Sequence, residues 1–248
     1  TGYRMPNVDD IGKLFESAPG NVAVPNPDLS PEYAWNFEVG VVKNISQKFR
    51  LELNGFHTIL NDAIVRRSAT FNGQDSIIFD GVNSRVEALQ NVAKATVWGF
   101  QASVEYYIIK YLSVLTHANW ITGKETDDTK NEQVALRHAP PFYGSTLIRY
   151  RFKKLFVEAS ANYNSKIKNE DLAPSEQAKT DIYAKDDNGK PYSPGWYTLN
   201  LKASFQITKN LMATTGWDNF TNQRYRPYSS GIVAAGSNFI IGLRASLN

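Results

Sequence analysis

The sequence predicts an all-β fold, specifically an antiparallel up-and-down transmembrane β-barrel, and two observations support this. Residues 197–207 alternate apolar and polar side chains without interruption, and in an extended strand such side chains point to opposite faces. Their length matches the roughly 9–11 residues of a tilted membrane-crossing strand, whereas a soluble strand usually has about five or six. The connections between such segments alternate between short and long, as in the hairpin meander of an outer-membrane barrel.

The amino-acid composition is consistent with a protein that crosses the membrane with β-strands. Hydrophobic residues make up 42% of the chain, mean hydropathy is −0.39, and no run approaches the ~18 consecutive apolar residues of a membrane helix. A barrel strand places its lipid-facing residues at every second position, so its average hydropathy resembles that of a soluble protein. Aromatic residues reach 12%, which suits interfacial girdles but also the filling of a β core.

The predicted strands begin after an N-terminal loop. Residues 1–29 are rich in Pro and Gly and predict a loop with one helical turn near 8–16. A strand that begins at Phe49 changes phase past Gly55, which predicts a bulge there. The predicted strands are 33–41, 49–65, 100–106, 112–120, 143–152, 155–163, 197–207, 211–218 and 239–247.

Long connections separate pairs of these strands, and short ones join the members of each pair. The short connections are 43–48, 109–111, 153–154 and 208–210. The long ones are 66–89, with an Asn72-Gly73 signal for a small hairpin standing clear of the sheet, 123–141, 166–194, with an Asn188-Gly189 turn, and 219–237. Long connections on one edge disfavour a Greek-key sandwich.

The predicted strand number is about nine, whereas single-chain bacterial barrels have an even number. Residues 1–30 also lack a basic segment followed by an apolar one, the pattern of a signal peptide. We therefore expect residues 1–248 to be the C-terminal portion of a larger outer-membrane barrel.

The sequence contains no recognisable motif for a catalytic site or a metal site. The chain has no cysteine and therefore no disulfide or thiolate site. Its three histidines do not have the spacing of a zinc site, and no G-x-S-x-G elbow is present. A net charge of +3 without a dense basic block argues against nucleic acid as a partner. We expect no enzyme activity, no metal site and no cofactor.

The polar faces of the strands carry charges of both signs. Such groups would be costly against lipid but not against a hydrated lumen or a polar plug. In a soluble barrel the same face would be the outside. The residues predicted to face the lumen or plug are Glu38, Glu52, Glu105, Asn119, Glu158, Lys202 and Arg244.

Four segments resemble those of a known family, the TonB-dependent outer-membrane receptors. They are 2–6 (GYRMP), 26–32 (NPDLSPE), 91–101 with its Asn91-Val92 and Gly99-Phe100-Gln101, and 218–225 (DNFTNQRY). The first is similar to the family's F/Y-R-A-P segment with Met in place of Ala, the second to N-P-D/N-L-x-P-E, the third to N-x-x-x-A-x-x-x-G-F/E and the last to N-L-F-N-x-x-Y.

This resemblance implies a barrel of about 22 strands that carries a plug, with the plug and earlier strands N-terminal to this chain. It implies a protein of the bacterial outer membrane that imports a scarce ligand, haem or a ferric siderophore. The extracellular loops would capture the ligand, and movement of the plug would then admit it. The TonB energy-transducing complex would drive this movement through the N-terminal region. Two features depart from the family: the chain ends in Ser246-Leu247-Asn248 and not in an aromatic residue, and residues 6–25 lack the histidine that haem receptors often carry there.

Candidate ligand contacts lie in the predicted loops, where aromatic rings accompany guanidinium groups and suit a flat or anionic ligand. The alternative for each is a role in bracing the loops, most of all for Arg4 and Tyr225, which belong to the family-like segments. The candidates are Tyr3, Arg4, Phe15, Arg137, His138, Arg224, Tyr225, Arg226 and Tyr228. Two other functions stay open: a passive porin or structural barrel, and a soluble secreted β protein that binds glycans.

Overall fold

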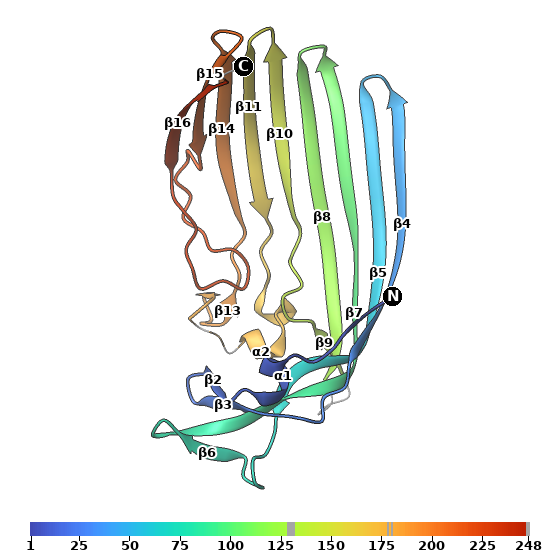
Figure 1. Ribbon diagram of the computed structural model, residues 1–248, viewed down its shortest axis with the longest axis vertical. Helices are drawn as coiled ribbons and strands as arrows, with labels where there is room; N and C mark the ends of the chain where they lie inside the picture. Colours follow the sequence, from blue (N-terminus) through green and yellow to red (C-terminus); the bar gives the residue numbers. More distant parts are fainter. Residues whose placement is uncertain (128–131, 178, 180, 247–248) are drawn as a thin grey trace. The chain divides into compact units, whose positions relative to one another are not determined.

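The computed structural model describes residues 1–127, 132–177, 179 and 181–246. Its dominant feature is a sheet with the strand order β1-β4-β5-β7-β8-β10-β11-β14-β15-β16 (Figure 1). This order confirms the predicted antiparallel meander. The strands are β1 (Gly2–Arg4), β4 (Glu32–Ser46), β5 (Phe49–Ser68), β7 (Val82–Ile109), β8 (Leu112–Asp127), β10 (Tyr143–Phe152), β11 (Leu155–Asn164), β14 (Trp196–Gln206), β15 (Leu211–Asp218) and β16 (Asn238–Ala245).

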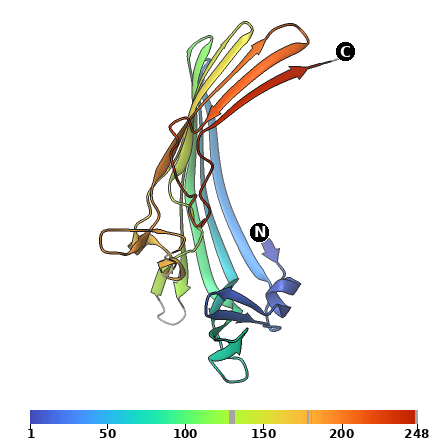
Figure 2. The same cartoon turned by 90° about the vertical axis from the view of Figure 1, so that its left-hand side faces the viewer.

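The chain forms two compact units, which we describe separately. The first unit comprises residues 1–37, 57–97 and 124–134, and the second comprises 38–56, 98–123 and 135–248. In the second unit the four short turns lie at one end of the strands, and the sheet is curved (Figures 1 and 2). The pairing is regular: β10 and β11 match from Tyr143 opposite Asn164 to Phe152 opposite Leu155.

The two faces of the second unit's sheet differ in polarity, as predicted. On β14 the apolar Leu201 and Phe205 are exposed, while Thr198 and Asn200 on the other face are buried. Other apolar side chains on the predicted outer face are exposed too, namely Val39, Val41, Phe100, Trp120, Tyr197, Trp217, Phe239, Ile241 and Leu243. Among the described residues, no helix is long and apolar enough to cross a membrane.

The first unit has its own small core. Strands β2 (Phe15–Ala18) and β3 (Asn21–Val24) form a hairpin, and β3 pairs in parallel with the start of β7. Val22 and Val24 of β3 pack against Val86 and Ala88 of β7. A further strand, β6 (Ser76–Phe79), pairs with the same part of β7.

Two asparagines of the family-like segments hold the connections of the first unit. The Asn91 side chain donates from Nδ2 to the carbonyl oxygens of Ser30 (2.9 Å) and Asp62 (2.6 Å) and accepts from the Ser30 amide at 2.8 Å. Asn26 donates from Nδ2 to the carbonyl of Leu89 at 2.7 Å. Each side chain therefore ties a connection to backbone groups of a neighbouring strand.

The first loop is more structured than predicted. The helical turn exists as α1 (Val8–Gly12), closed by a capping box between Asn7 and Asp10. The predicted extent of 8–16 was wrong because β2 begins at Phe15. Residues 1–29 are also not a plain loop, since they contain β1, β2 and β3, and the parallel partner of β3 lies more than sixty residues away in sequence.

The connection 66–89 is shorter than predicted because β5 and β7 extend into it. The Asn72-Gly73 turn is confirmed, with φ of 51° and 77°. A second turn at Asp80-Gly81, with φ of 47° and 81°, closes the β6–β7 hairpin. Within β5, Asp62 has a positive φ of 53°, and Gly55 does not have a positive φ.

Two of the three remaining long connections also contain short elements. Strand β8 continues to Asp127 and pairs with β9 (Glu132–Ala135), and 219–237 has no helix or strand. The last strand ends at Ala245, and the predicted end at Leu247 lies outside the described residues. Within 166–194 are the 3-10 turn η1 (Asn169–Asp171), α2 (Pro174–Gln177), β12 (Ala184–Lys185) and β13 (Pro191–Tyr192), with Gly189 at φ 76° in the predicted turn.

Candidate ligand-binding site

Strand register places a group of polar and aromatic residues on one face of the second unit. Ser145 of β10 lies opposite His117 of β8 and Asn162 of β11, and Tyr143 lies opposite Asn119 and Asn164. Directly opposed residues share a face of the sheet. On β14 the two rows continue to Thr198 and Trp196. These rows belong to the polar face, at the strand ends that lead into the long connections.

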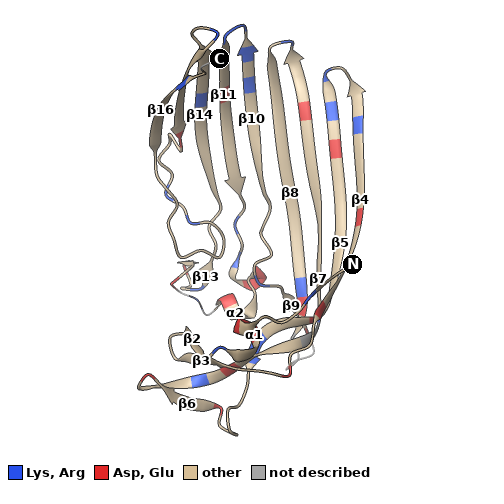
Figure 3. Cartoon of the chain, in the orientation of Figure 1, with Lys and Arg blue, Asp and Glu red and all other residues tan. Residues whose placement is uncertain are grey.

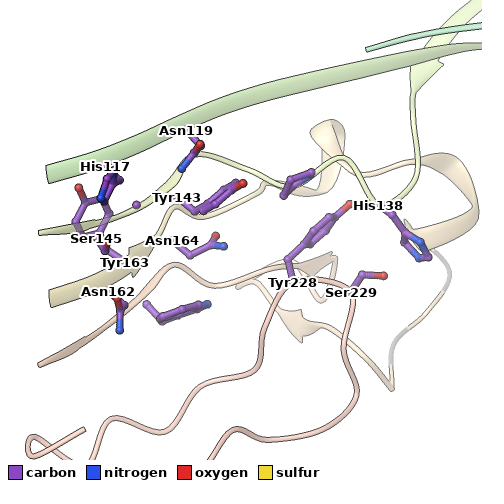
Figure 4. Close-up of a pocket in the computed structure, with 13 residues that line it drawn as sticks. His117, Asn119, His138, Tyr143, Ser145, Asn162, Tyr163, Asn164, Tyr228 and Ser229 are labelled. Carbon is purple, nitrogen blue, oxygen red and sulfur yellow. The ribbon is translucent and has the colours of Figure 1, made fainter. Parts of the chain in front are cut away.

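A cavity of about 740 Å³ lies against these rows. Figure 4 shows the strand residues grouped at one side, with Tyr228, Ser229 and His138 on loop segments at the other. A cavity of this size falls in the range of small-molecule sites, roughly 300–1,000 Å³. Its lining residues are His117, Asn119, His138, Pro140, Tyr143, Gly144, Ser145, Asn162, Tyr163, Asn164, Trp196, Tyr228 and Ser229.

Gly144 leaves room for a neighbouring aromatic ring. A Cβ at Gly144 would lie 2.8 Å from the ring and hydroxyl of Tyr163 and even closer to the carbonyl oxygen of His117. The Tyr163 ring stacks on Phe142, with centroids 6.0 Å apart. The missing side chain of Gly144 therefore makes the space that Tyr163 occupies.

A buried carboxylate, Glu176 of α2, ties three connections together. It has no exposed surface, and it accepts hydrogen bonds from the hydroxyls of Tyr183 (2.8 Å), Tyr228 (2.7 Å) and Ser229 (2.9 Å). The Arg137 Nε lies 3.9 Å from its Oε1. A buried charge needs such partners to offset lost hydration. Glu176 therefore fixes Tyr228 and Ser229 where they line the cavity.

The surroundings of Glu176 shift the pKa values of its partners. Burial and then the hydrogen bond to Glu176 raise the pKa of Tyr228, and the same two causes raise the pKa of Tyr183. Both phenols therefore stay protonated and donate to the carboxylate. Burial, together with the nearby Arg137, lowers the pKa of His138 below its usual value. His138 has a positive φ of 65°, a conformation uncommon outside glycine.

A second cavity of about 430 Å³ holds the other predicted residues of this unit. Arg224, Tyr225 and Arg226 line it together with Trp196. The Tyr225 ring stacks on Trp196 at 4.1 Å and 30°. Arg226 donates from Nη1 to the carbonyl oxygens of Asp181 (3.0 Å) and Ile182 (3.2 Å). Tyr225 and Arg226 thus also brace the loops that carry them.

The predicted contacts Tyr3, Arg4 and Phe15 belong to the first unit. Arg4 forms ion pairs with Glu32 (2.6 Å) and Asp10 (2.7 Å), which join β4 and α1. The remaining two take part in aromatic contacts: Tyr3 lies 6.4 Å from Tyr33, and the Phe15 ring lies within 5.5 Å of Lys13 and 5.3 Å of Arg66. Nothing in these contacts singles out a ligand.

The predicted lumen-facing residues are mostly engaged with neighbours. Glu158 pairs with Arg149 at 2.8 Å, and Lys202 lies 3.8 Å from Asp218. Asn119 lines the large cavity, and with Glu38 and Glu52 it also lines a hollow of about 370 Å³. Glu105 accepts from the Tyr107 hydroxyl at 3.0 Å, and Arg244 of β16 is exposed opposite Met212.

Sequence reasoning missed Glu176 and, apart from Asn119, the polar rows. A single Glu in a polar stretch gives no signal by itself, and only the adjoining Leu172 and Ala173, both buried, hint at a packed loop. Among the described residues, no group of three or more His, Cys, Asp or Glu side chains could hold a metal ion.

Comparison with known proteins identifies the family. Residues 1–220 match the family described as "TonB dependent receptor-like, beta-barrel". The chain belongs to this family. The resemblance predicted from the four sequence segments is therefore confirmed, and the chain is a TonB-dependent receptor barrel segment. Comparison with curated protein sequences gives no match.

Solved structures share the fold of this TonB-dependent receptor segment at low sequence identity. The copper transporter OprC superposes with a TM-score of 0.72 at 16% identity, covering 99% of this chain and 35% of OprC. A double mutant of the ferric enterobactin receptor PfeA from Pseudomonas aeruginosa gives 0.72 at 16%, covering 98% and 36%. The siderophore receptor PirA from Acinetobacter baumannii gives 0.66 at 16%, covering 92% and 33%. The chain thus spans about a third of the length of each.

Proposed function

We propose that this chain forms part of the barrel wall of a TonB-dependent importer in a bacterial outer membrane, and that the importer takes up a ferric siderophore or haem. Family membership supports the general class of receptor. The arrangement of the second unit supports a transport role, because an apolar face is exposed on one side of the sheet while a loop-capped cavity lies on the other. A wall between lipid and a polar lumen needs these two faces.

Capture would be non-covalent. The cavity offers the rings of Tyr143, Tyr163, Trp196 and Tyr228 for stacking. Glu176 holds the loop residues of the cavity in place, so little ordering would be needed when the ligand binds. The second cavity adds the guanidinium groups of Arg224 and Arg226. No residue in this arrangement has to form or break a bond, in keeping with a transporter and not an enzyme.

In this proposal, the other parts needed for transport belong to a longer protein that includes residues 1–248. The matched solved structures are about three times as long as this chain. We infer that residues 1–248 are a C-terminal portion of the barrel, and that the remaining strands, the plug and the segment that contacts the TonB complex lie upstream. Membrane lipid would cover the apolar face.

Transport measurements in cells test this function. Cells that make the complete receptor should bind radiolabelled ferric siderophore or haem at the surface and accumulate it. When the energy-transducing protein is deleted, accumulation should stop while surface binding continues. Equal accumulation with and without that protein would instead identify a passive pore.

A further inference from the structure

We infer that the large cavity of the second unit selects an electrically neutral ferric chelate over an anionic one. This inference rests on the proposed function and names the class of ligand for the same site. It follows from three features: the absence of charged side chains in the cavity lining, the pairing of several charges near it, and lining amide groups that have no protein partner.

The lining of the cavity carries no charged side chain. Its 13 residues are aromatic, amide, hydroxyl, imidazole, Pro and Gly residues, without Lys, Arg, Asp or Glu. His138 favours the neutral imidazole because burial lowers its pKa. An anion that enters this cavity would lose hydration and find no cation among the lining side chains.

Several charges near the cavity are already paired. Arg137 lies 3.9 Å from the buried Glu176. A row of charges on the same face runs from Arg149 through Glu158 to Lys202, and Arg149 pairs with Glu158 while Lys202 pairs with Asp218. Together, these two cations and two carboxylates cancel.

This charged row is also remote from the cavity. It lies four residues along the strand from the row of His117, because Arg149 is opposite Ser113. At about 3.3 Å per residue the separation is roughly 13 Å, which exceeds the screening length of about 8 Å at physiological salt. Figure 3 shows the charged bands of β10 and β14 near their short-turn ends. On the other side, the Glu38 carboxylate in the neighbouring hollow adds negative charge.

Three amides on the wall are available to a ligand. Within the described part of the chain, the side chains of Asn119, Asn162 and Asn164 make no hydrogen bond to another protein group, although all three line the cavity. Each amide offers two donors and one acceptor oxygen. A neutral hydroxamate chelate carries amide-like donors and acceptors around an uncharged centre, and its apolar linkers fit the aromatic rings.

Binding to the complete receptor that contains this chain tests the inference. The probes are a neutral ferric trihydroxamate and a trianionic ferric tris-catecholate, with tryptophan fluorescence quenching as the readout. We expect the neutral chelate to bind at least about tenfold more tightly. Equal or tighter binding of the tris-catecholate would overturn the inference and leave the proposed function intact. Binding of neither chelate, with haem binding retained, would overturn the inference alone, and binding of no iron compound would overturn both.

Charge-introducing variants locate the selectivity. Asn162→Lys and, as an independent second position, Asn119→Lys should each strengthen binding of the tris-catecholate by about tenfold or more. Asn188→Lys in the exposed β12–β13 turn adds the same charge away from the cavity and should have no such effect. Heat-modifiable gel mobility would identify variants that fold. An equal gain for the Asn188 control would show that net protein charge, and not the cavity, determines selectivity.

Discussion

Glu176 is the residue on which the shape of the candidate site depends most. Its carboxylate accepts three hydroxyl hydrogen bonds from two different connections and lies near Arg137 of a third. Because it is fully buried, removing the acceptor leaves polar hydrogens without partners, and that cost exceeds the net value of the bonds themselves.

We predict that Glu176→Ala loosens all three connections together. Hydrogen bonds to a charged group contribute about 1.5–3 kcal/mol each, so the free energy of local opening should fall by about 3 kcal/mol or more. Amide hydrogen exchange in 166–177 and 225–231 should accelerate by about a hundredfold. Glu176→Gln, which keeps one acceptor oxygen, should have a smaller effect.

Glu170→Ala is the matched control for Glu176→Ala. Glu170 lies in the same connection, but its side chain is 69% exposed and pairs with Lys168 at 3.4 Å. Exposed pairs of this kind contribute about 0–1 kcal/mol, so exchange should hardly change. Equal acceleration in both variants would argue against a special role for the buried carboxylate.

His138 makes the loops sensitive to acid. Its pKa in the folded protein is lowered by burial and by Arg137, with Glu176 opposing and Lys179 adding to the shift. Between the lowered folded pKa and the usual histidine pKa of about 6.5, the unfolded loop therefore binds more protons than the folded one. Loop stability should be fully present above pH 6.5 and should fall as the pH drops through the folded pKa.

Hydrogen exchange of the loop amides at pH 7.5 and 5.5, corrected for the intrinsic rate, measures this acid sensitivity. His138→Asn removes the titrating group and tolerates the positive φ at this position, so its loop stability should lose that pH dependence. A histidine NMR titration with a pKa above 6.5 would contradict the assignment.

At the scale of elements, side-chain alternation predicted the strands well and their ends poorly. The apolar phase of β14 holds because each residue shift would move Leu201 and Phe205 to the polar face. The extensions of β5 and β7 were missed because their outer parts are stabilised by partners distant in sequence, such as β3 against β7. The same limit applies to the site, where Asn162 and Tyr143 come together only through strand register.

Gly144 on β10 allows a prediction about the stability of this strand. Gly144→Ala would force the Tyr163 ring away from its present place, because the new Cβ would lie 2.8 Å from it. Such overpacking costs about 1–3 kcal/mol. The urea midpoint of the folded receptor should fall, and ligand quenching should weaken with it. Gly216→Ala, whose Cβ would meet only Lys202 Cγ at 3.8 Å, should change stability by about 0.5 kcal/mol or less.

If Gly144→Ala and Gly216→Ala lowered the urea midpoint equally little, the structure around Gly144 would be able to accommodate the added Cβ without a loss of stability. The contrast matters because the two glycines lie on paired, regular strands and differ mainly in what surrounds them.

At the scale of the molecule, the arrangement of turns and the polarity of the two faces were predictable, and the ligand was not. The apolar face could be recognised because bulky side chains such as Phe205 and Trp217 recur in phase with a period of two residues. Contiguous exposed apolar surface of this kind marks contact with a membrane or a partner. The cavity forms only when the long connections are folded, in particular when Glu176 contacts Tyr228. These two residues are distant in sequence, so no local sequence pattern predicts their contact.

The central claim is that one face of this sheet meets lipid and the other a polar lumen. Residues 1–248 contain no cysteine, so in a complete receptor whose other segments are also free of cysteine, single cysteines introduced at positions 201–206 can carry spin labels in a bilayer. Labels at Leu201, Ala203 and Phe205 should respond most to lipid-soluble oxygen, and those at Lys202, Ser204 and Gln206 most to a water-soluble nickel chelate. Uniform accessibility along 201–206, or the opposite phase, would contradict the account.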